Sequence, residues 1–213
     1  MSQPETITLD LMRQSLYSAV VCDALDGLGF TNQSPRTQLL SLTVDEVLVG
    51  RCRTTSWEDI DFEDPAPYEL ELQAVDSCEA DDVLICAANG SMRSGIWGEL
   101  LSTAAKNRGC VGAIVDGAVR DITKMKAMGF TVFATARCIY DSLNRQRVVE
   151  ILGDDVGIET RGGTGQRRSR QPPASSHLAD PANQGRRRRT LGRLLADLPS
   201  LLGLENIVEI GQQ

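Results

Sequence analysis

Histidine, aromatic residues and paired cysteines are scarce in this chain. One histidine, His177, occurs in 213 residues, together with two tryptophans, three tyrosines and four phenylalanines. Because His177 lies in a Pro/Ser-rich stretch, the sequence does not favour a histidine-based metal site or a Ser-His-Asp triad. The six cysteines form no C-x-x-C pair and most lie in apolar runs, which favours buried free thiols over disulfides or zinc ligands. They are Cys22, Cys52, Cys78, Cys86, Cys110 and Cys138.

Long hydrophobic runs and excess positive charge are also missing. No run approaches the eighteen or so apolar residues that a membrane helix requires. The first ten residues, MSQPETITLD, are polar and acidic and do not resemble a signal peptide. We therefore expect a cytoplasmic protein with no membrane partner. The formal net charge of −7 makes nucleic acid an unlikely general partner.

The hydrophobic content of 41% is typical of a globular domain, and its pattern alternates between short apolar runs and helical spacing. Strands that alternate with helices predict a layered α/β fold with a mostly parallel central sheet. One or two helices over 8–29 precede this region, and a hairpin or strand pair over 146–160 follows it. The expected strands are 46–57, 81–88, 110–117 and 130–136; the expected helices are 67–78, 94–109 and 118–129.

The composition changes after Thr160. Residues 161–189 are rich in Arg, Gly and Pro and contain almost no large apolar residue, so we expect this segment to be disordered. Helical spacing of leucines returns over 190–213, which predicts a C-terminal helix. The sequence therefore indicates an α/β domain over 1–160 followed by these two segments.

The stretch from Gly98 to Asp121 places charged residues where ligands bind in α/β proteins. In a parallel sheet, ligands lie beyond the carboxyl ends of the strands, where helix N-termini point. If a helix starts near Gly98, the amides of Glu99, Leu100 and Leu101 are among its unpaired donors and suit a small carboxylate or phosphate. The absence of a side chain at Gly98 allows a ligand to approach the backbone.

One strand later, Arg120 and Asp121 follow an Asp-Gly bend. Arginine can grip a carboxylate with two hydrogen bonds, and the carboxylates of Asp121 and Glu99 suit Mg²⁺ or Mn²⁺. These residues predict a site for a small 2-oxo acid, in which a metal at Asp121 polarises the keto oxygen and stabilises an enolate. The alternative is that Glu99 and Asp121 only complement helix dipoles. Trp97 borders the site or packs in the core.

The stretch WGELLSTAAKNRGCVGAIVDGAVRDI, with SAVVCDALDGLG upstream, resembles the regulator of ribonuclease activity A-like family. That family includes metal-dependent 4-hydroxy-4-methyl-2-oxoglutarate/4-carboxy-4-hydroxy-2-oxoadipate aldolases. The resemblance covers roughly residues 10–160, and residues 161–200 depart from the family pattern. It implies a swivelling α/β/α sandwich that assembles as a homotrimer or hexamer.

The resemblance also implies roles for the central residues. Gly98, Glu99, Leu100 and Leu101 would form the substrate loop, and Arg120 would bind the pyruvyl carboxylate. Asp121 would ligate Mg²⁺ or Mn²⁺, and Glu99 would position a water for proton transfer, although the well-studied aldolases carry Asp at that position. The implied activity is a lyase that releases pyruvate and also decarboxylates oxaloacetate. The alternative is a non-catalytic regulator of the ribonuclease E inhibitor type, which binds a protein partner.

Overall fold

The computed structural model describes residues 7–31, 34–35, 37–44, 47–152 and 207–210. These residues fall into two units, one that contains helices α1 and α2 and one that contains the sheet. None of the described helices is long and apolar enough to cross a membrane. The predictions for 153–206, including the segment 161–189 and most of the C-terminal helix, lie outside the described residues.

The first unit contains the two helices expected over 8–29. Helix α1 (Leu9–Ser15) begins after Thr8, whose Oγ1 accepts a hydrogen bond from the Leu11 amide at 3.2 Å. This contact satisfies one of the amides that a helix start leaves without a partner. Helix α2 (Ser18–Gly27) ends before Gly29, which has a φ of +87°. Glycine adopts this conformation without steric cost, so the predicted C-terminal stop is confirmed.

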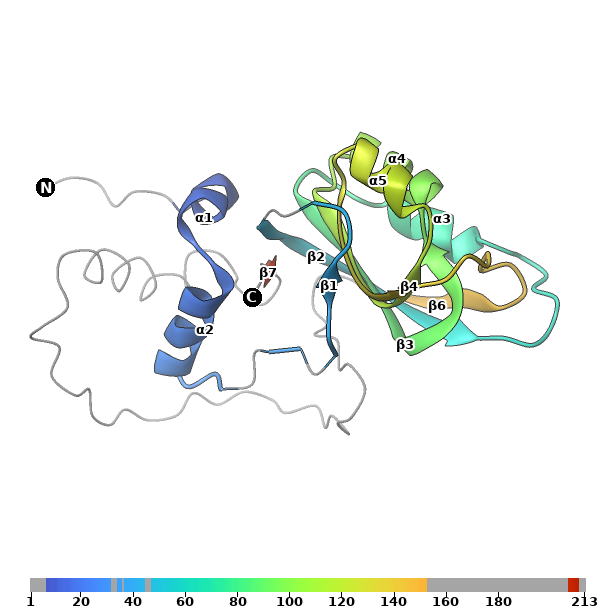
Figure 1. Ribbon diagram of the computed structural model, residues 1–213, viewed down its shortest axis with the longest axis horizontal. Helices are drawn as coiled ribbons and strands as arrows, with labels where there is room; N and C mark the ends of the chain where they lie inside the picture. Colours follow the sequence, from blue (N-terminus) through green and yellow to red (C-terminus); the bar gives the residue numbers. More distant parts are fainter. Residues whose placement is uncertain (1–6, 32–33, 36, 45–46, 153–206, 211–213) are drawn as a thin grey trace, which may run out of the picture. The chain divides into compact units, whose positions relative to one another are not determined.

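The second unit is a seven-stranded sheet in the order β1-β5-β4-β3-β2-β6, with β7 paired to β2 (Figure 1). Strands β2, β3, β4 and β5 pair parallel with one another, whereas β1 pairs antiparallel with β5, and β6 and β7 pair antiparallel with β2. The predicted mostly parallel α/β sheet is therefore confirmed. The strands are β1 (Leu40–Ser41), β2 (Leu48–Asp59), β3 (Asp82–Trp97), β4 (Gly112–Val119), β5 (Thr131–Arg137), β6 (Gln146–Leu152) and β7 (Ile207–Ile210).

Helices α3 (Glu69–Asp76), α4 (Glu99–Asn107) and α5 (Ile122–Ala127) cover one face of the sheet (Figure 1). Their buried side chains, such as Val75, Ala105 and Met125, share one hydrophobic core with alternate residues of the strands. The residues between them in the strands, including Ile114 and Phe133, form a smaller cluster on the opposite face. All eight residues of β4 are buried, as expected for a central parallel strand.

Three predicted boundaries are wrong. Residues 94–97 extend β3 instead of starting a helix, and residues 118–119 extend β4. Asn89 and Gly90, which directly follow the strand expected over 81–88, both have positive φ and lie inside β3 where its register shifts. A bulge therefore replaces the expected strand end, because two residues in the left-handed region bend a strand without ending its pairing.

The C-terminal helix prediction is wrong for residues 207–210, which form β7. This strand pairs antiparallel with Leu48–Arg51, at the start of β2, whereas β6 pairs with the second half of β2. The sequence Ile-Val-Glu-Ile is rich in β-branched residues, which favour strands. Tertiary pairing with an otherwise open edge of β2 therefore outweighs the helical spacing of the leucines before it.

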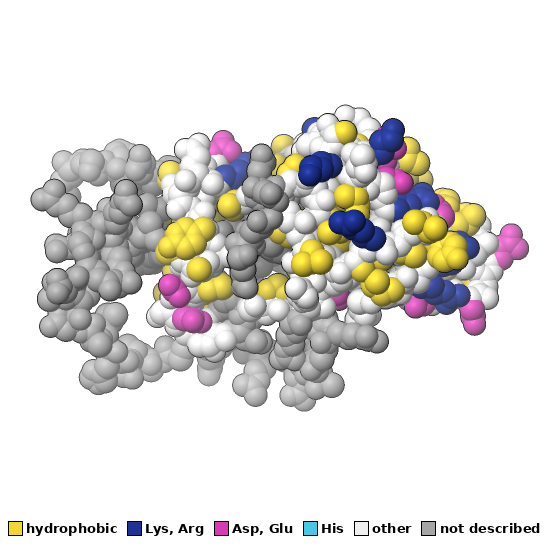
Figure 2. Space-filling view, in the orientation of Figure 1, with side chains coloured by type: hydrophobic (Ala, Val, Ile, Leu, Met, Phe, Trp, Pro, Cys, Tyr) yellow, Lys and Arg dark blue, Asp and Glu magenta, His cyan; other side chains and the backbone are white. Residues whose placement is uncertain are grey.

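All six cysteines are free, as predicted. Cys78, Cys86 and Cys110 are buried, but Cys22, Cys52 and Cys138 are only partly buried. On the face shown in Figure 2, charged side chains of both signs and hydrophobic side chains are interspersed over the sheet unit. Among the side chains that the structure describes, this face shows no continuous basic stripe of the kind typical of nucleic-acid-binding proteins.

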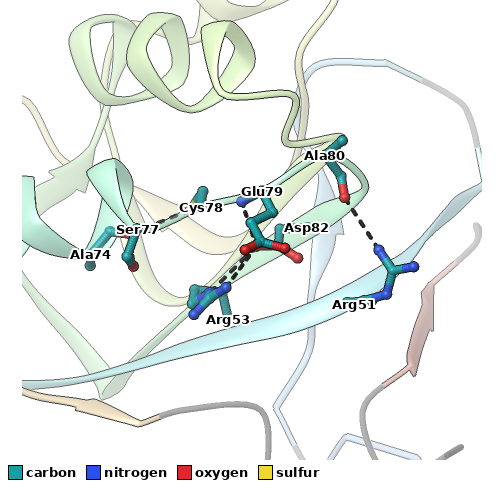
Figure 3. A network of polar contacts seen from close by, with 8 residues as sticks. All are labelled: Arg51, Arg53, Ala74, Ser77, Cys78, Glu79, Ala80 and Asp82. Carbon is teal, nitrogen blue, oxygen red and sulfur yellow. Dashed lines mark hydrogen bonds and ion pairs between the residues drawn. The ribbon is translucent and has the colours of Figure 1, made fainter.

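A network of hydrogen bonds and an ion pair lies at the end of the sheet where β3 begins (Figure 3). The buried Asp82 carboxylate accepts hydrogen bonds from the Glu79 amide at 2.9 Å and from Arg53 Nη2 at 3.2 Å. Arg51 reaches the carbonyl of Ala80 at 3.3 Å in the same turn. These contacts hold the α3–β3 connection against β2.

We predict that Asp82→Ala lowers the free energy of unfolding by about 2 kcal/mol, because it leaves the partly buried Arg53 guanidinium and the Glu79 amide without the carboxylate that both contact. Urea denaturation measures the change. Asp76→Ala is the control, since Asp76 forms an exposed ion pair with Arg108 and should cost less than about 0.5 kcal/mol. Equal effects of the two substitutions would contradict the role given to Asp82.

Candidate active site

The site is built where β3 and β4 end side by side. Trp97, the last residue of β3, is in register with Val119, the last residue of β4. One residue later, the Arg120 amide donates a hydrogen bond to the Trp97 carbonyl at 2.9 Å. The two connections that follow, at Gly98 and at Arg120, therefore leave the sheet as neighbours.

Gly98 is the N-cap of α4 and allows close contact with the next connection. A Cβ atom at Gly98 would lie 2.6 Å from Asp121 Oδ2 and 3.1 Å from Arg120 Cγ, which is too close for real side chains. The Glu99 amide, in the first turn of α4, lies 3.3 Å from Asp121 Oδ2 and donates to it. The N-terminal amides of α4 and the Arg120-Asp121 pair thus converge on one region.

Asp121 is the N-cap of α5 and has a φ of +55°. Aspartate tolerates this left-handed conformation better than most residues. Its Oδ2 lies 3.6 Å from Arg120 Nε, and its side chain is 39% exposed. The backbone conformation therefore turns this carboxylate back toward Arg120 and Gly98 while leaving it open to solvent.

Three further residues join the site, none of which the sequence analysis assigned to it. Asp141 lies in the connection between β5 and β6, and its Oδ2 is 2.6 Å from Arg120 Nη2. Tyr68 directly precedes α3, and its hydroxyl group donates a hydrogen bond to Asp141 Oδ1 at 2.6 Å. Glu71, in the first turn of α3, interacts electrostatically with Asp141 and Arg120. A possible signal for Asp141 was an acidic residue a few positions beyond a parallel strand, on the ligand side of the sheet.

The environment shifts the pKa of each of these three groups. Burial, reinforced by the Asp141 charge, raises the pKa of Glu71 to about 8, so this carboxyl is largely neutral at pH 7. Burial and the hydrogen bond to Asp141 raise the pKa of Tyr68 to about 12. Burial alone would raise the pKa of Asp141, but hydrogen bonds from Tyr68 and the Leu143 amide, together with Arg120, hold it below its usual value. Asp141 is therefore the ionised partner of Arg120.

The structure brings four of the predicted residues together: Gly98, Glu99, Arg120 and Asp121. The side chain of Leu101 is buried in the core, and that of Leu100 is 78% exposed, so these two residues can contribute their amides but not a shared side-chain surface. The roles of all six residues in binding and catalysis stay predictions.

Of the two alternatives for Trp97, the structure supports packing. Its side chain is buried, stacks with Phe130 at 6.4 Å between ring centroids, and donates from Nε1 to Ser102 Oγ at 2.7 Å. Trp97 therefore fixes the start of α4 against the end of β3.

The donor set fits a divalent cation that keeps most of its water ligands. Among the described residues, no three His, Cys, Asp or Glu side chains gather closely enough to enclose a metal ion. Mg²⁺ commonly binds proteins through only one or two carboxylates and retains several waters. The Asp121 carboxylate, whose side chain is 39% exposed, meets that requirement as a single protein ligand.

Glu71 makes stability depend on pH. Its folded-state pKa of about 8 lies above the ordinary value of 4.5 for a glutamate, so its contribution to stability is fully present below pH 4.5 and is lost as the pH rises through about 8. We predict that Glu71→Gln removes this loss. The Tm of the variant minus that of the wild type should therefore increase from pH 5 to pH 8, about the interval set by the two pKa values. Glu69→Gln, an exposed position in the same turn, is the matched control. Parallel Tm curves for wild type and Glu71→Gln would contradict the burial of a neutral carboxyl.

Comparison with known proteins agrees with the fold. Streptomyces coelicolor RraAS2, described as an unusual member of the RNase ES inhibitor RraA protein family, has a crystal structure that superposes with a TM-score of 0.58. The two chains are 24% identical, and the match covers 70% of this chain and 74% of RraAS2. At this identity the similarity shows a shared fold.

Two sequence relatives share the central part of the chain. A protein of Halalkalibacterium halodurans named "Putative 4-hydroxy-4-methyl-2-oxoglutarate aldolase" is 31% identical over 139 residues, which are 65% of this chain and 61% of that protein. Protein DlpA of Legionella pneumophila is 26% identical over 144 residues, 66% of this chain and 23% of DlpA. The chain thus spans less than two thirds of either relative.

The model of the RraA-like family, described as Aldolase/RraA, matches residues 18–160. The matched region contains α2, strands β1 to β6 and every residue of the candidate site. It ends where the composition of the sequence changes. Because the match covers well over half of the chain, this protein belongs to the RraA-like family.

Proposed function

We propose that this chain is a divalent-metal-dependent lyase that cleaves a 4-hydroxy-2-oxo acid and releases pyruvate. The observation that carries the proposal is the convergence of Arg120 with the first turn of α4, beside a glycine at which a Cβ atom would displace the Asp121 carboxylate. A guanidinium beside the first amides of a helix is a site for a carboxylate. The names of relatives in the family agree with a lyase that acts on such an acid.

Arg120 has a free direction in which to bind this carboxylate. Its Nε faces Asp121 and its Nη2 pairs with Asp141. Within the described part of the chain, Nη1 has no polar partner. The 2-oxo-acid carboxylate would bind on that side of the guanidinium and accept hydrogen bonds from the amides of Leu100 and Leu101.

The reaction requires that the C3–C4 bond of the substrate breaks after the 4-hydroxyl group loses its proton. The electron pair of the bond passes to C3 and gives the enolate of pyruvate, while C4 becomes a carbonyl carbon. Protonation at C3 then completes pyruvate. Glu99, beside the ligand carboxylate in the first turn of α4, would exchange these protons through a water molecule.

Asp121 would hold the divalent cation, which supplies Lewis-acid stabilisation to the keto group when bound. Loss of CO₂ from oxaloacetate produces the same enolate, so the proposal includes this decarboxylation. For 4-hydroxy-4-methyl-2-oxoglutarate, cleavage yields two molecules of pyruvate. A homotrimer or hexamer remains a prediction.

A pyruvate assay tests the proposal. Pyruvate released from 4-hydroxy-4-methyl-2-oxoglutarate or from oxaloacetate is measured through the coupled oxidation of NADH. We expect release with Mg²⁺ or Mn²⁺ and none after chelation. Arg120→Lys should raise KM about tenfold, because an ammonium cannot make the paired contact of a guanidinium. Arg108→Lys, at the far end of α4, is the control. Release that is insensitive to the chelator, or absent for both substrates, would refute the proposed function.

Gly98→Ala tests the geometry of the same site. The added Cβ would displace Asp121 or Arg120, so we expect kcat/KM to fall at least about tenfold, corresponding to a loss of roughly 1.4 kcal/mol. Gly27→Ala is the matched control, because a Cβ at Gly27 meets no atom within 4 Å. Unchanged kinetics in Gly98→Ala would place the ligand elsewhere.

A further inference from the structure

Hydrogen bonds on both sides of Asp141 hold the connection between β5 and β6 in place. The Cys138 amide donates to the Val119 carbonyl at 3.0 Å, and the Gly95 amide donates to the Tyr140 carbonyl at 2.9 Å. On the far side, Arg145 Nη1 donates to the carbonyl of Asp141 at 3.2 Å. The backbone of Asp141 is therefore fixed to the ends of β3 and β4, from which the candidate site is built.

The close passage of this connection depends on Gly95. A Cβ atom at Gly95 would lie 2.5 Å from the Cys138 carbonyl oxygen and 3.0 Å from the Cβ and N atoms of Arg120. Any side chain at this position would force the connection away from Arg120. Gly95 in β3 and Gly98 directly after it both lie next to Arg120. Because neither has a side chain, two other chain segments can approach Arg120 closely.

The Asp141 carboxylate is fully engaged. Its Oδ1 accepts from the Tyr68 hydroxyl at 2.6 Å and from the Leu143 amide at 2.8 Å, and its Oδ2 pairs with Arg120 Nη2 at 2.6 Å. Donors on one oxygen fix the carboxylate plane and leave the other oxygen facing the guanidinium. The contact to Arg120 is far shorter than the 3.6 Å between Arg120 Nε and Asp121 Oδ2, so Asp141 is the stronger orienting partner.

We propose that Asp141, held by Tyr68, is a positioning residue that orients the Arg120 guanidinium toward the carboxylate of the 2-oxo acid. This inference rests on the proposed function. Arginine side chains lose much rotamer freedom when they bind a ligand, and a fixed partner removes that loss before binding. Because the shorter contact to the guanidinium comes from Asp141, Asp121 pairs with Arg120 only at 3.6 Å through Oδ2 and would offer its Oδ1 to the cation.

The charges around the pair agree with this role. Arg120, Asp121 and Asp141 carry one positive and two negative charges at neutral pH. Glu71, which would add a third negative charge, has its pKa raised to about 8 by burial and by Asp141, so it is largely neutral. Four carboxyl groups occur on the segments around the site, those of Glu71, Glu99, Asp121 and Asp141. Because that of Glu71 is neutral, an anionic ligand meets less electrostatic repulsion than four carboxylates would cause.

Steady-state kinetics of Asp141→Asn, Tyr68→Phe and the double variant test the inference. An amide at position 141 keeps the shape but removes the charge, so we expect KM to rise about tenfold with a smaller change in kcat. Tyr68→Phe should raise KM about threefold, and the double variant should match Asp141→Asn, because both residues act through one chain of contacts. Glu58→Gln, which removes a carboxylate from the Arg147 ion pair, is the control.

A separate readout tests the contact itself. Absorbance titration of tyrosine should show that the Tyr68 pKa of about 12 falls toward 10 in Asp141→Asn, with Tyr68→Phe identifying the signal. If Asp141→Asn lowers the Tyr68 pKa but leaves KM within about twofold of wild type, the contact is structural and the inference is overturned. An unchanged Tyr68 pKa overturns it as well.

The inference remains testable if the proposed lyase reaction fails. In that case, calorimetric titration with pyruvate in the absence of turnover replaces KM. Binding by the wild type that weakens about tenfold in Asp141→Asn supports a positioning role in a carboxylate-binding site without the proposed chemistry. Equal affinity for the two proteins, or no binding by the wild type, overturns the inference. If Asp141→Asn does not fold, Tyr68→Phe, which removes one hydroxyl group, provides the same comparison.

Discussion

The candidate site depends on the parallel pairing of β3 with β4. Because Trp97 and Val119 are in register, the residues that follow them, Gly98 and Arg120, leave the sheet next to each other. The hydrogen bond from the Arg120 amide to the Trp97 carbonyl extends the pairing by one residue beyond the strands. A shift of one residue in this register would turn the site side chains to the other face and separate them.

Backbone conformation then converts this proximity into a site. Gly98 removes the steric barrier between the start of α4 and Asp121, and the left-handed conformation of Asp121 turns its carboxylate toward the same point. Gly95 does the same for the connection that carries Asp141. The arginine therefore lies among three chain segments that approach more closely than side chains of ordinary size would allow. Close approach of backbone, more than any single side chain, sets the geometry.

The two ends of the sheet have different physical properties. Where β3 begins, Asp82 is buried and its partners are fixed by the α3–β3 turn, so the network serves cohesion (Figure 3). Where β3 and β4 end, Arg120 and Asp121 remain about one third exposed and their hydrogen-bonding capacity is not exhausted. The stabilising network and the candidate site thus lie at opposite ends of the same strands, with the candidate site at the carboxyl ends, where ligands bind in parallel α/β sheets.

The sequence by itself determined the alternation of strands and helices, the stops at Gly29, Gly109 and Gly129, and the four residues Gly98, Glu99, Arg120 and Asp121 as neighbours. These follow from local periodicity, glycine conformations and the position of strand ends, which are short-range properties. Strand pairing extended β3 to Trp97 and made residues 207–210 a strand, because both outcomes depend on partners distant in the sequence. Asp141, Tyr68 and Glu71 likewise became part of the site only through tertiary structure. Their sequence contexts are ordinary, and only folding brings α3 and the β5–β6 connection to Arg120 and shifts their pKa values.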